Sequence, residues 1–209
     1  MKAHTRETQA TMTPQKSLQY LKEGNERFQN NLKANRNLLE QVNDTSDGQF
    51  PFATILSCID SRVSAELVFD QGLGDIFSVR IAGNFVNEDI LGSMEFASKL
   101  AGTKLILVLG HTSCGAIKGA CDDAKLGNLT TMLSKIKPAV NAVKEPEDKS
   151  LRNSKNLDFV DSVSEKNVML TMNKIRELSP ILKEMEDNNE IDIVGGMYDI
   201  NTGAVAFFE

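Results

Sequence analysis

The chain has 209 residues, of which 41% are hydrophobic and 25% charged, and its formal net charge at pH 7 is −6. This composition is typical of a globular protein with a sizeable core, and its negative balance argues against a nucleic-acid partner or an anionic membrane surface. No stretch reaches the roughly 20 apolar residues that cross a bilayer, so we expect no membrane insertion.

Residues 1–12 are polar and unpatterned, and we expect them to form a mobile tail. Thr13 and Pro14 then supply an N-cap and a first helical residue. Apolar residues follow at helical spacing, at Leu18, Leu21, Phe28 and Leu32. This pattern predicts a helix over residues 14–32, which we expect to be an extended N-terminal arm that buries its apolar stripe against a neighbouring subunit.

Five short apolar runs predict β-strands, at residues 52–57, 76–80, 104–109, 191–194 and 204–208. Helical patterns separate the first four runs, and one of them, residues 90–101, ends at Gly102. The alternation predicts an α/β fold with a mostly parallel central sheet flanked by helices. The turn sequence at residues 199–203 predicts a hairpin, which makes the last strand an antiparallel edge strand at the C-terminus.

A charged run at residues 144–156 has no apolar period and predicts a surface loop. The amphipathic segment that follows, residues 157–178, predicts one helix that ends before Pro180. One helix is too little for a separate domain, so we expect residues 13–209 to form a single α/β domain.

Chemically reactive side chains follow two of the predicted strands. Cys58, Asp60 and Arg62 lie in the run CIDSRV, and His111 and Cys114 lie in the run GHTSCGAI. Ligands bind at the carboxyl ends of the strands in an open parallel sheet, so two thiols and one imidazole can converge there on one metal ion. Three such ligands suit Zn²⁺ with a fourth position left open, which is typical of a catalytic rather than a structural site.

Each of these residues has a simpler interpretation when it is taken alone. A cysteine after a strand is more often a packed core residue, and the HxxC spacing is frequent by chance. Cys121 lies two helical turns past Cys114 without a charged partner, and we expect it only to pack. Three cysteines do not favour a disulfide framework, and reduced thiols favour a cytoplasmic protein over an exported one whose signal has been removed.

Asp60 and Arg62, taken alone, would be a helix cap and a solvated surface residue. Beside a metal, the arginine can hold the carboxylate in a bidentate pair and keep it ionised. The carboxylate can then accept the proton of a water whose pKa Zn²⁺ lowers to about 7, which supplies a hydroxide nucleophile. Asp60 can alternatively turn and fill the fourth zinc position itself.

The sequence resembles the β-class carbonic anhydrases from Gln15 to Glu209. The resemblance rests on CIDSRV and GHTSCGAI, on FDQGLGDIFSVRIAGN at residues 69–84 and on GSMEFA at residues 92–97, with weaker support from LKEGNERF and GGMYDINTGAVAFF. It implies Zn²⁺ held by Cys58, His111 and Cys114, a dyad of Asp60 and Arg62, and reversible hydration of CO₂ to bicarbonate and a proton.

The resemblance also implies a homodimer or higher homo-oligomer whose N-terminal helices embrace the partner, with an apolar CO₂ pocket near the subunit boundary. Val63, Leu91 and Phe96 match apolar positions of that pocket, the backbone of Gly115 lies near the substrate, and Gln71 is the polar group nearby. Phe96 stands where many relatives have tyrosine, and Ile59 stands where serine is commoner. The sequence has no tryptophan, around which one subgroup builds a regulatory bicarbonate site.

Two other functions fit the same residues. One is hydrolysis of carbon disulfide or carbonyl sulfide, which are also linear and apolar, on the same scaffold; access to the pocket and release of sulfide would distinguish it. The other is a non-catalytic, zinc-stabilised binding protein, which would need a lost dyad or a permanently filled fourth position, whereas Asp60 and Arg62 are both present.

Overall fold

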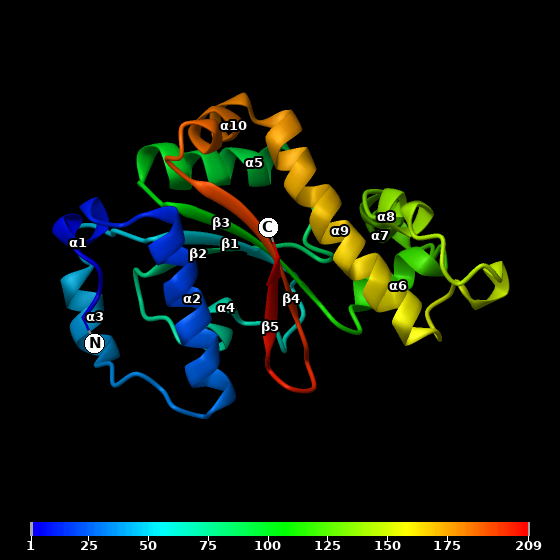
Figure 1. Cartoon of the computed structure of the whole chain (residues 1–209), viewed down its shortest axis with the longest axis horizontal. Coiled ribbons are helices and arrows are strands. Elements are labelled where there is room, and N and C mark those ends of the chain that lie inside the picture. The colour runs from blue at the N-terminus through cyan, green and yellow to red at the C-terminus, as the bar shows by residue number, and fades with distance from the viewer. Residues whose placement is uncertain (1, 209) are drawn as a thin grey trace.

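A five-stranded sheet forms the centre of the molecule in the computed structural model, which describes residues 2–208. The strands are β1 (Ala53–Ser57), β2 (Ile76–Arg80), β3 (Leu105–His111), β4 (Asp192–Tyr198) and β5 (Val205–Phe208). Their order is β2-β1-β3-β4-β5; the first four are parallel, and β5 runs antiparallel to β4 at the edge (Figure 1). The predicted strands, the parallel sheet and the C-terminal hairpin are confirmed.

Helices account for most of the remaining chain. They are α1 (Arg6–Ala10), α2 (Pro14–Gln29), α3 (Leu38–Asp44), α4 (Ala65–Val68), α5 (Glu88–Glu95), α6 (Gly115–Cys121), α7 (Gly127–Ser134), α8 (Lys137–Ala142), α9 (Leu157–Leu178) and α10 (Pro180–Asp187). A π-helical turn, Phe96–Leu100, continues α5, and the segment ends at Gly102 in the left-handed region with φ of 83°. Among the described residues, no helix combines the length and the apolar character needed to cross a membrane.

The two faces of the sheet are covered by different helices, because alternate residues of a strand point to opposite faces. Ile55 and Leu107 face α2 and α4, whereas Leu56 and Ile106 face α5, α9 and α10. All of β1 and β3 is buried, as expected of central strands in a parallel sheet. The sheet therefore holds the carboxyl ends of β1 and β3 rigidly.

The N-terminal helix packs on the sheet of its own chain, and the expected burial against a neighbouring subunit is wrong for most of its stripe. Leu18 and Leu21 are buried in the core cluster that covers one face of the sheet. Close approach depends on Gly24, where a Cβ would lie 1.8 Å from the carbonyl oxygen of Phe69. The helix ends at Gln29, three residues earlier than expected, and leaves Leu32 63% exposed.

Residues 2–12 differ from the mobile tail that we expected. Thr5 caps α1 in a capping box with Thr8. The side-chain amide of Gln9 donates to the backbone oxygens of Pro51 and Ala101, at 2.8 Å each. These contacts are made by polar side chains, so they leave no periodic pattern of apolar residues from which the sequence could predict them.

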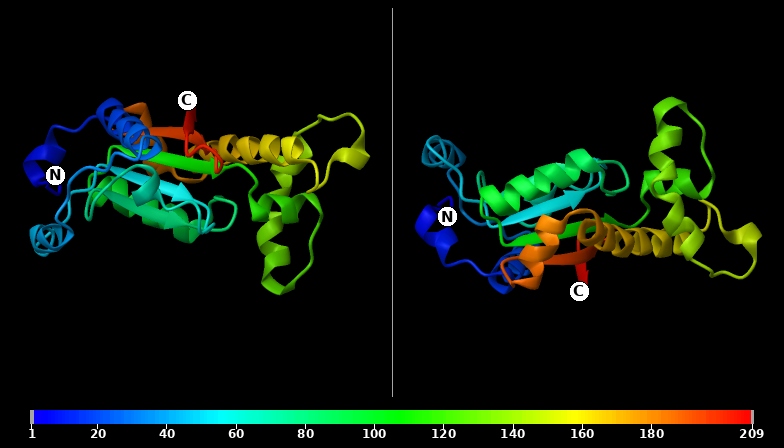
Figure 2. Two further views of the ribbon diagram at one scale, coloured as in Figure 1. Left: turned by 90° about the horizontal axis from the view of Figure 1, so that it is seen from below. Right: turned by 90° about the horizontal axis from the view of Figure 1, so that it is seen from above.

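Beyond the carboxyl ends of the strands, α6, α7 and α8 stand at one end of the molecule, and α9 extends there from the sheet (Figure 2). These helices enclose a third apolar cluster that includes Ile117, Leu133, Ile136, Phe159 and Val163. Cys58 and Cys114 belong to the same cluster. The two reactive sequence runs therefore meet between the sheet and this helical end.

Candidate metal centre

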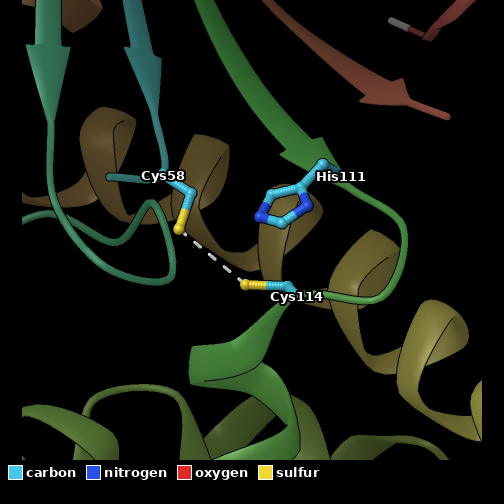
Figure 3. Close-up of side chains that lie close together, drawn as sticks. All are labelled: Cys58, His111 and Cys114. Carbon is cyan, nitrogen blue, oxygen red and sulfur yellow. Dashed lines mark hydrogen bonds between the residues drawn. The ribbon is translucent and has the colours of Figure 1, made fainter. Parts of the chain in front are cut away.

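The switch point of the sheet lies between β1 and β3. The chain passes from β1 to β2 on one side and then crosses to β3 on the other, which opens a crevice at the strand ends. Cys58 directly follows β1, His111 is the last residue of β3, and Cys114 is the N-cap residue of α6. Figure 3 shows the three side chains converging from these elements.

The spacing of the three donor atoms fits one metal ion. They all lie within 4.8 Å of one another, and the two sulfur atoms are 3.9 Å apart. Two sulfurs at 2.3 Å from a tetrahedral Zn²⁺ would be about 3.8 Å apart. All three side chains are buried, which excludes competing water ligands from most of the site.

His111 presents its Nε2 atom without a hydrogen-bond partner. The Nδ1 atom lies 2.9 Å from the backbone oxygen of Thr112, so it is placed to carry the proton and donate it. Nε2 then bears the lone pair, and it is buried and unpartnered. A buried polar atom of this kind costs free energy unless something binds it, and a metal ion would.

The side chains of Cys58 and Cys114 lie within hydrogen-bond distance of each other, and this contact shifts their pKa values in opposite directions. Cys114 donates its hydrogen bond to Cys58, which lowers the pKa of Cys58 to about 4, with support from His111 and the Gly83 amide. The pKa of Cys114 is raised, because its proton is held by the Cys58 sulfur and because the thiol is buried. A divalent cation is the group that would let both sulfurs exist as thiolates.

Asp60 and Arg62 form the expected pair beside this centre. Nε of Arg62 donates to Oδ1 of Asp60 at 2.9 Å, and Nη2 donates to Oδ2 at 2.7 Å. These bonds hold the pKa of the Asp60 carboxyl well below its usual range. The Oδ2 atom lies 3.9 Å from Nε2 of His111, so an ionised oxygen borders the place where the three donors converge.

The backbone between Cys58 and Asp60 is held by a residue that the sequence interpretation did not single out. Nε of Arg80 donates to the backbone oxygen of Cys58 at 3.0 Å, and its Nη2 donates to that of Asp60 at 2.7 Å. Arg80 ends β2 and pairs with Ser57 across the sheet. Its position at the end of a strand next to β1 was the signal that could have identified it.

Two residues of α9 brace the same loops. Asp161 accepts a hydrogen bond from the backbone N–H of Ser113, which has a φ of 55° between His111 and Cys114. Asn167 donates to the backbone oxygen of Gly83 at 2.8 Å. The sequence shows only a helix there, because such contacts depend on packing between distant segments.

Within one chain, the five residues expected in the substrate pocket do not all line one cavity, and the pocket expected near a subunit boundary stays a prediction. A pocket of about 240 Å³ adjoins Cys58 and Asp60, and Gly115 lines it. Val63 and Leu91 are instead buried in the cores on opposite faces of the sheet.

The other two expected residues also lie outside this pocket. Phe96 is 52% exposed and packs against Phe77, and the Gln71 amide donates to the backbone oxygen of Phe69 at 2.6 Å. Within this one chain, Gly115 is therefore the only expected pocket residue that lies beside the donor group.

Comparison with known proteins gives a consistent result. A family model described as carbonic anhydrase matches residues 53–205. Carbonic anhydrase 2 of Mycobacterium tuberculosis is 35% identical over 189 residues, which cover 88% of this chain and 87% of that protein. A carbonic anhydrase of Mycolicibacterium smegmatis is 32% identical over 191 residues, covering 88% of each chain.

Solved structures with the same fold include the β-carbonic anhydrase CcaA, with a TM-score of 0.72 and 26% identity over 92% of this chain and 95% of that one. The β-carbonic anhydrase of Coccomyxa in complex with acetazolamide has a TM-score of 0.68 and 26% identity, covering 78% of this chain and 74% of that one.

Proposed function

Because this chain belongs to the β-carbonic anhydrase family and is a carbonic anhydrase, we propose that it hydrates CO₂ reversibly to bicarbonate and a proton with Zn²⁺ as its cofactor. Cys58, His111 and Cys114 would hold the ion. The observation that carries this proposal is the convergence of three buried donor atoms within 4.8 Å, one of them an unpartnered imidazole nitrogen.

Bound Zn²⁺ supplies Lewis-acid chemistry, since it lowers the pKa of a coordinated water to about 7. The residues of the chain orient that chemistry. Arg62 holds both carboxylate oxygens of Asp60, which keeps the group ionised and fixes its direction. Oδ2, the oxygen nearer Nε2 of His111, is then placed to accept a hydrogen bond from the attacking water.

The proton released in each turnover must leave the site. The sequence has two histidines, His4 and His111. The ring of His4 packs against Tyr20 and Phe52, at the start of β1 and thus the opposite end of the sheet from the donor group. With His111 committed to the metal, no other histidine is available as a shuttle, so proton export depends on buffer in solution.

We further propose a homodimer or larger homo-oligomer in the cytoplasm. Two β-carbonic anhydrases of Sordaria macrospora that share this fold are described as tetrameric, with a TM-score of 0.68 and 22% identity over 79% of this chain and 84% of the matched one. Cys58, Cys114 and Cys121 form no disulfide, which favours a reducing compartment.

The test is stopped-flow CO₂ hydration by the purified protein before and after zinc removal with dipicolinate. Hydration that disappears on chelation and returns on adding Zn²⁺ supports the proposal. A protein that binds zinc without hydrating CO₂ would be a non-catalytic binding protein. Faster release of sulfide from carbonyl sulfide than hydration of CO₂ would assign it to the sulfur analogues.

A further inference from the structure

The pocket beside Cys58 has one wall made of very small residues. This wall is a face of α6 formed by Gly115, Ala116 and Gly119, where no side chain extends beyond Cβ. A Cβ added at Gly115 would meet no heavy atom within 4 Å. A Cβ at Gly119, by contrast, would lie 3.2 Å from Cδ1 of Leu133, so the pocket is open at Gly115 and narrow at Gly119.

The opposite wall consists of large apolar side chains of α7. Leu129, Met132 and Leu133 line the pocket there. Leu133 is buried in the apolar cluster at the helical end of the molecule, whereas Leu129 and Met132 are only half-buried at its border. Leu129 and Met132 therefore lie on the accessible part of this wall, where their bulk limits the width of the pocket.

The pocket joins the surface to the donor group. Its lining includes Cys58 and Asp60 at the metal centre and Ile59, which is 60% exposed. Asp60 is the only charged residue among those that line it. Moving an ion between such walls costs desolvation free energy, whereas a neutral apolar molecule meets no such cost.

We propose that Leu129 and Met132 form a size filter in front of the metal centre, which admits small linear apolar molecules and excludes bulky ones. The filter rests on the proposed function in taking Zn²⁺ as the ion of this centre and CO₂ as its natural substrate. The pocket volume of about 240 Å³ is below the 300–1,000 Å³ that is usual for drug-sized ligands, so a bulky molecule must displace these side chains.

The family resemblance implies other residues around the substrate, in a pocket near a subunit boundary. Val63, Leu91 and Phe96 were expected to supply the apolar surroundings of the substrate, but none of them lines this pocket. The residues that do so lie on α7, more than 60 positions after Val63 in the sequence. Removing bulk from α7 should therefore change which molecules reach the site.

Calorimetric titration of the zinc-loaded full-length protein with two ligands tests the filter. Azide is a linear triatomic anion of about the length of CO₂, and acetazolamide is a bulky primary sulfonamide. The desolvation cost of the azide charge is the same in every variant, so a change in its affinity between variants reports the width of the pocket. Met132→Ala should raise the affinity for acetazolamide about fivefold or more, which corresponds to relief of about 1 kcal/mol of overpacking. The affinity for azide should stay within about twofold, because a small ligand gains nothing from the extra width.

Two further variants make the test decisive. Met169→Ala is the matched control, since Met169 is an exposed methionine on α9 and should leave both affinities unchanged. Met132→Phe keeps the side chain large and should weaken acetazolamide selectively, which remains informative if Met132→Ala does not fold. Equal changes for both ligands, or the same gain in Met169→Ala, would overturn the filter.

The filter and the proposed function can fail separately. Wild-type protein that binds both ligands with the expected selectivity, yet does not hydrate CO₂, would contradict the function and leave the filter standing. If the wild-type protein hydrates CO₂ but Met132→Ala and Met132→Phe bind acetazolamide as tightly as wild type, the filter is contradicted and the proposed function stands.

Discussion

Replacing Arg62 by alanine separates the positioning of Asp60 from the stability of the fold. The substitution removes the two side-chain bonds at 2.9 and 2.7 Å, but the backbone N–H of residue 62 still donates to Oδ1 at 3.0 Å. Asp60 therefore keeps one hydrogen bond, to Oδ1, and loses the hydrogen bond that orients Oδ2. That oxygen, 3.9 Å from Nε2 of His111, can then turn toward the metal position.

The expected cost to stability is small because the Arg62 side chain is 51% exposed. Exposed ion pairs contribute about 0.2–1 kcal/mol to the free energy of unfolding, which lowers the melting temperature of a chain this long by at most about 4 °C. The cost to activity is much larger, since misplacing a catalytic group by about 1 Å can reduce the rate about 100-fold.

A second ion pair provides the matched control. Arg176 makes a bidentate pair with Glu186 and also donates to the backbone oxygen of Ile193, and its side chain is 28% exposed. Arg176→Ala should cost more stability, about 1–3 kcal/mol, because hydrogen bonds to charged groups contribute this much when partly buried. It should leave CO₂ hydration unchanged, since the pair lies between α9 and α10.

The assay pairs thermal unfolding with kcat/KM for CO₂ hydration in wild type, Arg62→Ala, Arg62→Lys and Arg176→Ala. The lysine variant keeps the charge but not the bidentate geometry, so its activity should be intermediate. Full activity in Arg62→Ala would refute the positioning role. A loss of activity in proportion to stability across all variants would refute it as well.

The remaining predictions concern the proton, acid stability and the N-terminal helix. Lowering the buffer concentration should reduce kcat while changing kcat/KM little, because the proposed role of His111 as a metal ligand leaves it unable to carry the proton; buffer-independent kcat would reveal an internal shuttle. Burial tends to raise the pKa of Asp70, but hydrogen bonds from Arg27, the Ala34 amide and Arg36 lower it overall. The ionised Asp70 carboxylate therefore stabilises the fold at pH values above its unfolded pKa of about 3.9, and this stabilisation is lost as pH falls through its lower folded pKa. Asp70→Asn should accordingly lower the urea concentration at the midpoint of unfolding more at pH 6 than at pH 3. Leu21→Ala should lower the melting temperature by about 4–20 °C, since a fully buried leucine contributes about 2–5 kcal/mol to the free energy of unfolding. If this variant instead dissociates into monomers without a lower melting temperature, α2 packs on a neighbouring subunit.

The sequence was most informative where local pattern and chemistry coincide. The apolar runs before Cys58 and before His111 predict buried parallel strands, and the carboxyl ends of such strands meet at one edge of a sheet. Two thiols and an imidazole at these ends therefore predict a common site without any knowledge of the distances. Cys121, two turns into α6, lies as expected in the apolar cluster and outside the donor group.

Features set by long-range packing could not be predicted in this way. The stripe on α2 shows that Leu18 and Leu21 are buried, but periodicity does not say which surface covers them. Arg80 reaches Cys58 and Asp60 only because β2 pairs with β1 in a particular register. Such placements depend on how distant segments meet, which a single sequence does not encode locally.

The lining of the pocket beside the candidate metal centre also depends on packing between distant segments. Leu129 and Met132 lie 15 and 18 residues after Cys114, and their side chains are apolar and unreactive, so the sequence does not mark them as part of a site. They line the site because α7 folds back on α6. Family resemblance placed the apolar surroundings at other residues, and only the packing of the helices shows this wall.

Zinc K-edge X-ray absorption of the zinc-loaded protein tests the central claim, that Cys58, His111 and Cys114 hold the ion. We predict two sulfur ligands at about 2.3 Å, one nitrogen ligand at about 2.0 Å and one oxygen ligand. The spectrum should be unchanged in Cys121→Ala, whereas Cys114→Ala should lose one sulfur or lose the metal altogether. A shell with no sulfur, or loss of sulfur in the Cys121 variant, would contradict the ligand set.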